Sequence, residues 1–272
     1  KKQIYIQDHE LLVGGVGFKP RCGILNPDSA AGVIEKEVDT ISNRPFDPFY
    51  LSDEGKQVYL NEVKDYWKNK CVLDRWNLML PEDVRRLRAN GAVFIDRKAV
   101  RGYGETTVGW RMILSKGLGA LKKEAEEKLA ALDDAVPGDL EKSFFYRAEI
   151  LAADAVIHLA NRHADLAEQM AAECADEKRK AELLKIAEVC RWVPEHPARN
   201  FYEACQSILS YEYACFMEQN ASSYNLGRLD QYLYPYYKAD KEAGILTDDD
   251  AQELLDCLWI KIAEMSLFQD EV

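Results

Sequence analysis

The chain has 272 residues, of which 47% are hydrophobic and 10% aromatic, and its 35 Lys and Arg against 47 Asp and Glu give a formal net charge of −12. This composition excludes an intrinsically disordered chain, because it offers enough apolar surface to offset the entropy cost of ordering. The acidic balance, with no cluster of Lys and Arg, argues against a nucleic-acid partner.

The sequence shows no sign of a membrane partner or of a disulfide framework. No stretch approaches the roughly 20 uninterrupted apolar residues of a membrane span, and the N-terminus has no apolar signal core, so we expect a cytoplasmic protein. The seven cysteines are scattered and never occur in C-x-x-C spacing, which argues against disulfides and against a zinc site. Residue 1 is Lys rather than Met, which favours an excised piece of a longer protein.

Residues 1–114 are predicted to be irregular with short strands. The apolar residues 11–13 precede a glycine-rich loop that Pro20 closes, which predicts a short buried strand. Residues 92–95 form a second, weaker strand candidate. Between them, Asp53 is a candidate N-cap for a helix that runs to about Lys70.

Residues 115–272 are predicted to be helical. A long helix is expected after Gly138, because apolar residues recur there at helical spacing and form one stripe that needs a partner surface: Phe144, Ala148, Leu151, Ala155, Leu159, Leu166 and Met170. Two further helices are expected over 177–192 and 198–219. In the last helix Thr247 is the predicted N-cap, and the predicted buried face consists of Leu254, Leu255, Leu258, Ile262 and Met265.

The fold class expected from these elements is mainly α with a few short strands, in a single region that spans residues 1–272. Two short strands cannot close a sheet of their own. The chain is therefore either an all-α bundle with decoration or a part of a fold whose sheet other sequence completes.

Several motifs give only weak signals. The glycine-rich run 13–17 lacks the helix start that a phosphate loop requires, and no G-x-S-x-G motif is present. His158 lies four residues after Asp154, but no further ligand shares that helix face, which favours a structural histidine over a metal site. Four cysteines lie among apolar helical residues, which argues against a cysteine nucleophile: Cys190, Cys205, Cys215 and Cys257.

The segment 218–237, EQNASSYNLGRLDQYLYPYY, differs in kind from the helices around it. Small and amide side chains follow an apolar helix there, and four tyrosines come within six residues. Small polar residues between buried elements commonly line a ligand pocket. The alternative is a polar connection between helices with a tyrosine-rich packing surface, and periodicity alone favours neither.

This segment and its continuation to Met265 resemble the corresponding part of the glycyl radical enzymes, the pyruvate formate-lyase family, and especially the branch of glycerol dehydratase and related dehydratases. Four further segments match the family in order and spacing: LLVGGVGFKPR, RPFDPFYLSDE, GYGETTVGWRMILSKGL and EVCRWVPEHPARNFYEACQSI. The resemblance covers essentially the whole chain. It implies a ten-stranded α/β barrel with outer helices, of which this chain would form the N-terminal portion.

The resemblance also implies radical chemistry that these residues do not complete. Family members carry a cysteine that becomes a thiyl radical and, near the C-terminus, a glycine whose radical is installed by an activating enzyme with an iron-sulfur cluster and S-adenosylmethionine. This sequence has no C-x-E and no adjacent cysteines, and residues 100–103 imitate the glycine motif within the substrate segment. We therefore expect no catalytic residue in this chain, an inactive isolated chain, and a homodimeric complete protein.

The resemblance also implies which residues bind substrate, because positions of this sequence correspond to substrate-binding positions of the family. Glu105 stands where the dehydratases have a substrate-binding His, and an ionised Glu, which only accepts hydrogen bonds, suits a cationic or hydroxyl-donating substrate. Ser222 and Ser223 stand where dehydratases have His-Ser and pyruvate formate-lyase has Ala-Ala, which disfavours pyruvate. Three further residues are the same as those at the corresponding positions of the family's motifs, and they either line the pocket or have a structural role: Asn220, Arg228 and Asp230.

The first hypothesis is the N-terminal portion of a glycyl radical lyase or dehydratase. Such an enzyme removes water or another leaving group from a small polar substrate after a thiyl radical has abstracted a hydrogen atom. The alternatives are pyruvate formate-lyase itself and a non-catalytic helical binding module.

Overall fold

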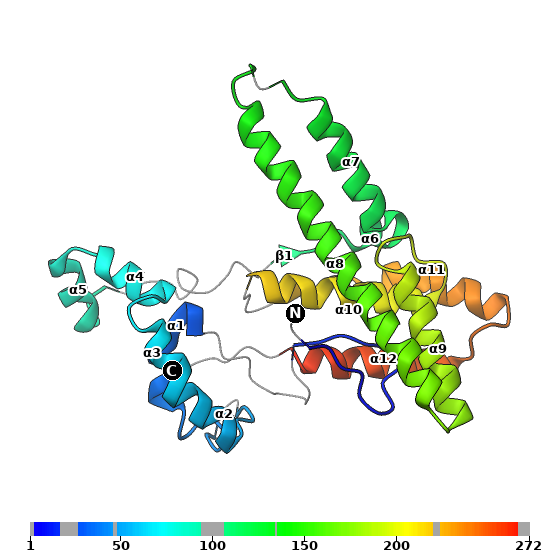
Figure 1. Cartoon of the computed structure of the whole chain (residues 1–272), viewed down its shortest axis with the longest axis horizontal. Helices are drawn as coiled ribbons and strands as arrows, with labels where there is room; N and C mark the ends of the chain where they lie inside the picture. Colours follow the sequence, from blue (N-terminus) through cyan, green and yellow to red (C-terminus); the bar gives the residue numbers. More distant parts are fainter. Residues whose placement is uncertain are drawn as a thin grey trace. The chain divides into compact units, whose positions relative to one another are not determined.

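The computed structural model describes residues 3–16, 27–45, 48–93, 106–133, 135–219 and 224–265. These residues are mainly helical (Figure 1). The strands among them, β1 (Thr106–Thr107) and β2 (Tyr224–Asn225), have two residues each and pair with one another. The chain divides into two compact units, the first made of residues 1–14, 107–214 and 226–262, and the second of residues 15–106, 215–225 and 263–272.

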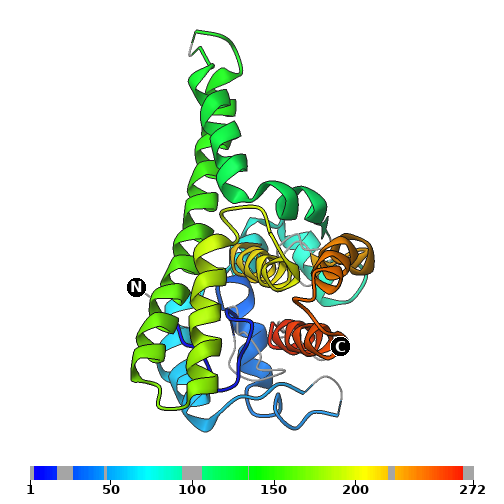
Figure 2. The same ribbon diagram turned by 90° about the vertical axis from the view of Figure 1, so that its right-hand side faces the viewer.

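The first unit is built from long helices. It contains α6 (Trp110–Lys116), α7 (Leu118–Ala130), α8 (Asp139–Glu173), α9 (Glu177–Trp192), α11 (Leu229–Glu242) and most of α10 (Phe201–Gln219) and α12 (Asp248–Ala263). The long helix α8 runs alongside α7 and then alongside α9 (Figures 1 and 2). The predicted start of α8 after Gly138 and the predicted bounds of α9 are confirmed.

The buried face of α8 is not the predicted one. Its buried positions are mostly small: Asp139, Ser143, Ala153, Ala160, His163, Ala164, Ala167 and Ala171. By contrast, Phe144 and Leu151 of the predicted stripe are 62% and 69% exposed. Leu166 and Met170 of the predicted stripe are partly buried and pack against a hydrophobic cluster. The prediction was wrong for the exposed members because a second stripe of alanines has the same helical spacing, and short side chains let neighbouring helices approach more closely.

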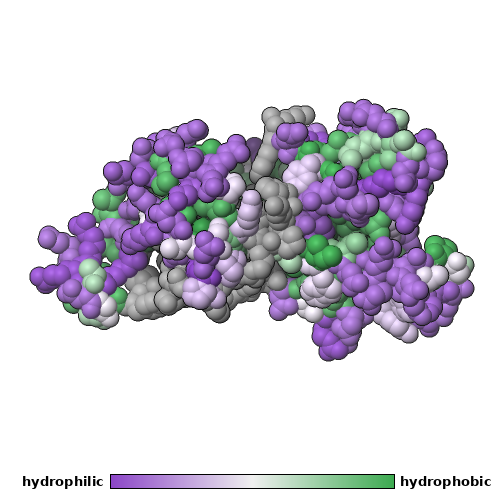
Figure 3. Space-filling view, turned by 90° about the horizontal axis from the view of Figure 1, so that it is seen from below, coloured by the Kyte–Doolittle hydropathy of each residue, from purple (hydrophilic) through white to green (hydrophobic). Residues whose placement is uncertain are grey.

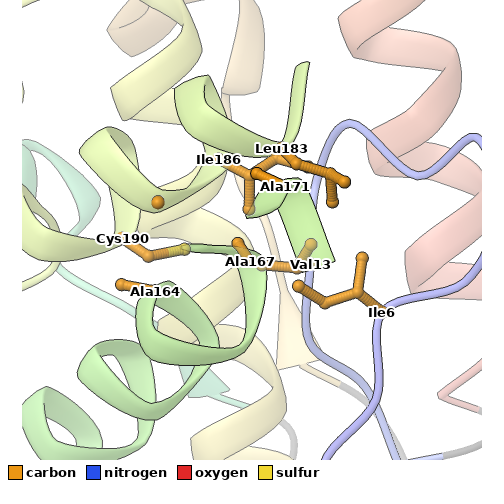
Figure 4. Packing of buried hydrophobic residues seen from close by; sticks show 9 residues of the cluster. Ile6, Val13, Ala164, Ala167, Ala171, Leu183, Ile186 and Cys190 are labelled. Carbon is orange, nitrogen blue, oxygen red and sulfur yellow. The ribbon is translucent and has the colours of Figure 1, made fainter. Parts of the chain in front are cut away.

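The N-terminal segment, residues 3–14, packs against this alanine face. Ile6 and Val13 belong to one hydrophobic cluster with residues of α8 and α9 (Figure 4), namely Ala164, Ala167, Ala171, Leu183, Ile186, Ala187 and Cys190. The cluster joins the first residues of the chain to helices more than 150 positions away in the sequence.

The strand predicted at residues 11–13 is not present. The side chain of Gln206, in the middle of α10, takes the place of a neighbouring strand: its Oε1 accepts a hydrogen bond from Val13 N (2.9 Å) and its Nε2 donates one to Val13 O (2.8 Å). The predicted burial of Leu12 and Val13 is confirmed, but the partner of the Val13 backbone is a side-chain amide and not a β-ladder.

Side chains of other helices hold the residues just before Val13. Arg179 of α9 donates hydrogen bonds to Glu10 O (2.8 Å) and Gln7 O (3.2 Å), and Tyr202 of α10 donates one to Leu11 O. Lys261 of α12 lies 2.7 Å from the Glu10 carboxylate, and these two side chains are only 4% and 11% exposed. Four interactions from three helices thus meet on residues 7–11.

Helix ends follow local capping chemistry. Thr247 is the predicted N-cap of α12, and it forms a reciprocal pair with Asp250, in which Thr247 Oγ1 accepts from Asp250 N (3.1 Å) and Asp250 Oδ2 accepts from Thr247 N (2.9 Å). Leu254, Leu258 and Met265 of the predicted face are buried, and Leu255 and Ile262 are half-buried.

The predicted start of α10 at residue 198 was three residues too early. The helix begins at Phe201, because Asn200 Oδ1 accepts a hydrogen bond from Glu203 N (2.9 Å) at its first turn. Asp240, from the distant helix α11, accepts a further hydrogen bond from Phe201 N (2.8 Å). This second partner is a tertiary contact that no local pattern shows.

The second unit contains short helices where the sequence predicted mostly irregular structure. They are α1 (Pro27–Glu37), α2 (Asp53–Val58), the π-helical turn η1 (Tyr59–Val63), α3 (Lys64–Trp67), α4 (Val72–Met79) and α5 (Glu82–Ala89). The predicted helix from residue 53 is present as α2, η1 and α3, but its N-cap is Ser52, whose Oγ accepts from Gly55 N (3.1 Å). Residues 92 and 93 form no strand, and 94–95 lie outside the described residues.

A compact apolar cluster explains why these short helices form. Tyr59 is buried with residues of α1 and the following turns, Ile34, Val38, Ile41 and Phe49. Its hydroxyl donates a hydrogen bond to Ala31 O (2.5 Å), and burial raises the pKa of Tyr59 to about 12. Helices of this length are marginal by themselves and depend on such packing, which is why periodicity did not reveal them.

On the face shown in Figure 3, hydrophilic residues cover much of the described surface, and hydrophobic residues lie in separate patches between them. Among the described residues, no helix combines the length and the apolar character needed to cross a bilayer.

We expect the substitution Lys261→Met to lower the free energy of unfolding by about 3–5 kcal/mol, because it leaves the Glu10 carboxylate buried without this cation. As a control, Lys241→Met breaks an ion pair with Asp248 at the surface and should cost less than about 1 kcal/mol. Urea unfolding followed by circular dichroism measures both losses. Equal losses would show that the buried pair does not hold the N-terminal segment.

The two faces of α8 should respond oppositely to substitution. Leu151→Ser is expected to change the free energy of unfolding by less than about 0.5 kcal/mol, because the side chain is exposed. Ala167→Leu should lower it by about 1–3 kcal/mol, since it adds volume to a packed helix interface. Thermal unfolding of both variants tests the assignment, and a larger loss for Leu151→Ser contradicts it.

Candidate functional site

Four of the residues predicted to contact substrate or line the pocket, Glu105, Asn220, Ser222 and Ser223, lie outside the described residues. The residues that follow them are described. β1 begins directly after Glu105 and β2 directly after Ser223, and the two strands pair. The pairing therefore holds together the stretches that come immediately after the two predicted substrate-binding segments.

Gly227, two residues after β2, lies close to Thr107 of β1. Gly227 has a positive φ of 62°, and a Cβ atom at this position would lie 3.2 Å from Thr107 Cγ2. Glycine suits the site for two reasons, since it adopts the left-handed backbone at little cost and leaves room for the threonine methyl group. The absence of a side chain at residue 227 thus allows the two stretches to approach.

A group of three aromatic side chains braces the same region. Trp110, at the start of α6, stacks on Tyr232 of α11 with ring centroids 6.2 Å apart and meets Tyr211 of α10 edge-on at 5.9 Å. The Tyr232 hydroxyl donates a hydrogen bond to Leu226 O (2.7 Å), directly after β2. Each aromatic pair of this kind contributes about 0.5–1.5 kcal/mol beyond its buried area. The group links α6, which follows β1, to the backbone that follows β2.

A buried carboxyl lies beside this aromatic group, and the sequence analysis missed it. Glu212 of α10 is 5% exposed, and its Oε2 has no hydrogen-bond partner in the described part of the chain. Burial raises the pKa of Glu212 to about 7. Burial also raises the pKa of Tyr232, and the Glu212 carboxylate raises it further, so the two side chains interact. The available signal was that Glu212 is the only charged residue between Glu203 and Glu218.

Arg228 and Asp230 lie at the start of α11. Both side chains are 73% exposed, and Arg228 Nε lies 3.7 Å from Asp230 Oδ1. An exposed pair of this kind contributes about 0–1 kcal/mol. In the described part of the chain these two residues form a surface ion pair, and neither is buried in a pocket.

The described residues contain no group of three or more His, Cys, Asp and Glu arranged to hold a metal ion. Asp154, the partner considered for His158, instead pairs with Lys122 at 2.6 Å. His163 is buried with Nδ1 2.9 Å from Leu159 O, and burial lowers its pKa, which favours the neutral ring. Burial also raises the pKa of Cys190 to about 12, so this thiol stays protonated and is a poor nucleophile.

Comparison with known proteins identifies related sequences over the whole chain. Residues 1–272 match the family described as pyruvate formate lyase-like. The chain is 38% identical over 271 residues to an isethionate sulfite-lyase of Bilophila wadsworthia, an alignment that covers 96% of this chain and 33% of the relative. The chain therefore spans about a third of the length of this curated relative.

Solved structures show the same relationship. The glycerol-bound B12-independent glycerol dehydratase of Clostridium butyricum superposes with a TM-score of 0.86 at 34% identity, over 100% of this chain and 34% of that one. A glycyl radical enzyme of Archaeoglobus fulgidus superposes with a TM-score of 0.84 at 32% identity, over 97% of this chain and 34% of that one.

We expect Gly227→Ala to be more destabilising than Gly91→Ala. Both glycines have positive φ, so each substitution carries the cost of about 1–2 kcal/mol of a left-handed alanine. Only at residue 227 does the new methyl group also press on Thr107, since nothing lies within 4 Å of a Cβ at Gly91. Chemical unfolding of the two variants isolates this contact, and identical losses would mean that the approach to Thr107 is not tight.

Proposed function

This chain belongs to the pyruvate formate lyase-like family, and from this we propose that the complete protein is a glycyl radical lyase or dehydratase that acts on a small polar substrate. The proteins similar to this chain include an isethionate sulfite-lyase, whose name describes the release of sulfite from isethionate, and a glycerol dehydratase, whose name describes the removal of water from glycerol. Both names describe an elimination. We therefore assign the protein to elimination chemistry and not to the cleavage of pyruvate.

The proposed reaction removes a leaving group together with one hydrogen. A thiyl radical abstracts a hydrogen atom from the substrate carbon that bears a hydroxyl group, and the bond from the neighbouring carbon to the leaving group breaks. The hydroxyl group gives up its proton to the leaving group and becomes a carbonyl, and the hydrogen atom is then returned to the product radical. The net change is loss of the protonated leaving group, so no external oxidant is needed. Because radicals are quenched by stray donors, this chemistry needs an enclosed site with little water.

In this proposal Glu105, Ser222 and Ser223 orient the substrate. The observation that carries it is the pairing of β1 with β2, because Glu105 and Ser223 each come one residue before a strand of that pair in the sequence. Tyr232, which stacks on Trp110, donates a hydrogen bond to the carbonyl of Leu226 directly after β2. Glu105 accepts hydrogen bonds from a substrate hydroxyl or cationic group, and the two serines both donate and accept them.

The remaining parts of the enzyme are proposed to come from outside these 272 residues. Neither a C-x-E motif nor a pair of adjacent cysteines occurs in the sequence, and the curated relative is about three times as long as this chain. We assign the thiyl cysteine, the radical glycine and the rest of a ten-stranded barrel to that further sequence. An activating enzyme with an iron-sulfur cluster and S-adenosylmethionine would install the radical in a cytoplasmic homodimer.

The alternatives make different predictions about the complete protein. Pyruvate formate-lyase proper requires cleavage of pyruvate, which the Ser222-Ser223 pair disfavours because the corresponding alanines leave more room. A binding module without catalysis requires that the complete protein lack both radical motifs.

We expect the complete, activated protein to eliminate a group from isethionate, glycerol or a similar hydroxylated substrate under anaerobic conditions, and to leave pyruvate unchanged. Ser223→Ala should lower kcat/KM by about 10-fold to 100-fold, because a substrate hydroxyl loses its partner in a closed site. Ser52→Ala, at the cap of α2, is the matched control and should leave kcat/KM unchanged. Robust cleavage of pyruvate by the unsubstituted enzyme would overturn the proposal.

A further inference from the structure

Glu212 is a buried carboxyl that the proposed reaction does not use. It lies on α10, it is 5% exposed, and its Oε2 has no hydrogen-bond partner in the described part of the chain. An ionised carboxylate that is buried without a compensating charge is strongly disfavoured, and such a group usually gives up its charge. Its surroundings therefore favour the neutral carboxylic acid.

The side chains near Glu212 are aromatic. Tyr232 reaches it from α11, Trp110 of α6 stacks on that tyrosine, and Tyr211 precedes Glu212 on its own helix. Tyr232 and Cys205 are titratable groups in this environment, and burial raises the pKa of both, so they are neutral near pH 7. Trp110 carries no charge. Among the described residues, a negative charge on Glu212 would thus be introduced beside uncharged side chains.

Tyr232 connects this carboxyl to the predicted substrate-binding segment. Its hydroxyl donates a hydrogen bond to Leu226 O (2.7 Å), and Leu226 follows β2 directly. A hydroxyl has a single proton to donate, and a carboxylate is a stronger acceptor than a backbone carbonyl. If Glu212 were ionised, it would compete with Leu226 for that proton.

We propose that Glu212 is a positioning residue that works as a neutral carboxylic acid: in this form it leaves the Tyr232 hydroxyl on Leu226 O and so fixes the backbone that follows Ser223. The positioning role of Glu212 rests on the proposed function, in which Ser223 contacts substrate. The physical inference, that the charge on Glu212 decides the partner of Tyr232, concerns the folded chain alone.

The pH dependence follows from the direction of the shift. The pKa of Glu212 is raised from 4.5 to about 7 by burial. The native state therefore binds a proton that the unfolded state has already lost, and this contribution to stability decreases as the pH rises from about 4.5 through about 7. Above this range Glu212 is ionised, and the hydrogen bond from Tyr232 to Leu226 is expected to weaken.

Infrared spectroscopy tests the protonation state directly. In the difference between the unsubstituted protein and Glu212→Gln, we expect a carbonyl band of a neutral carboxylic acid at pH 6 that is lost by pH 8.5. Glu242→Gln, at an exposed position of α11, is the control and should show no such band. Absence of the band at pH 6 would overturn the proposal.

Hydrogen exchange measured by mass spectrometry tests the effect on the backbone. For a peptide covering residues 224–232, exchange corrected for its intrinsic pH dependence should be about 10-fold faster at pH 8.5 than at pH 6 in the unsubstituted protein. Glu212→Gln should keep the slower rate at both pH values, because it is neutral and has nearly the same shape. Tyr232→Phe should give the faster rate at both.

Two results would contradict the proposal. One is faster exchange in Glu212→Gln at pH 6, which would mean that only the carboxyl itself packs correctly. The other is an equal pH response in the unsubstituted protein and in Glu212→Gln, which would assign the response to another group. Neither readout depends on turnover, so a failure of the proposed radical function would leave these results unchanged.

Discussion

The first unit depends on how the backbone of the partly buried N-terminal segment is satisfied. Buried N–H and C=O groups need hydrogen-bond partners, and a β-ladder is their usual source. Here the side-chain amide of Gln206 accepts a hydrogen bond from the N–H of Val13 and donates one to its C=O. Lys261 and Arg179 both bind Glu10, three residues before Val13, one through its carboxylate and the other through its carbonyl. Because these side chains belong to α9, α10 and α12, the segment fixes the three helices against each other.

Helix α10 connects this constraint to the candidate site. It is buried around most of its circumference and carries polar residues in its interior: Glu203, Gln206, Ser207, Ser210 and Glu212. Gln206 faces the N-terminal segment, while Glu212, six residues further on, lies beside Tyr232. Each buried polar group has to be satisfied or neutral. One helix therefore both orders the start of the chain and shapes the surroundings of the strand pair.

The described part of the candidate site consists of the strands β1 and β2 and the residues that follow each of them. β1 and β2 pair, Gly227 lies close to Thr107, and Tyr232, which stacks on Trp110, binds the backbone of Leu226 directly after β2. The family match over residues 1–272 connects this strand pair with a family of enzymes, and the related proteins act on small polar molecules. Rigid aromatic packing behind a binding segment reduces the conformational freedom that substrate binding would otherwise have to remove.

The sequence by itself determined the features that depend on neighbours a few positions away. The Thr247 cap, the bounds of α9 and the resemblance carried by residues 218–265 needed no knowledge of the tertiary structure. Only the tertiary structure decided which face of α8 is buried, that Gln206 replaces a strand, and that Glu212 Oε2 is buried without a hydrogen-bond partner in the described part of the chain. The physical reason is that capping and periodicity act within a few residues, whereas burial and the protonation of a carboxyl depend on groups that distant parts of the chain bring together.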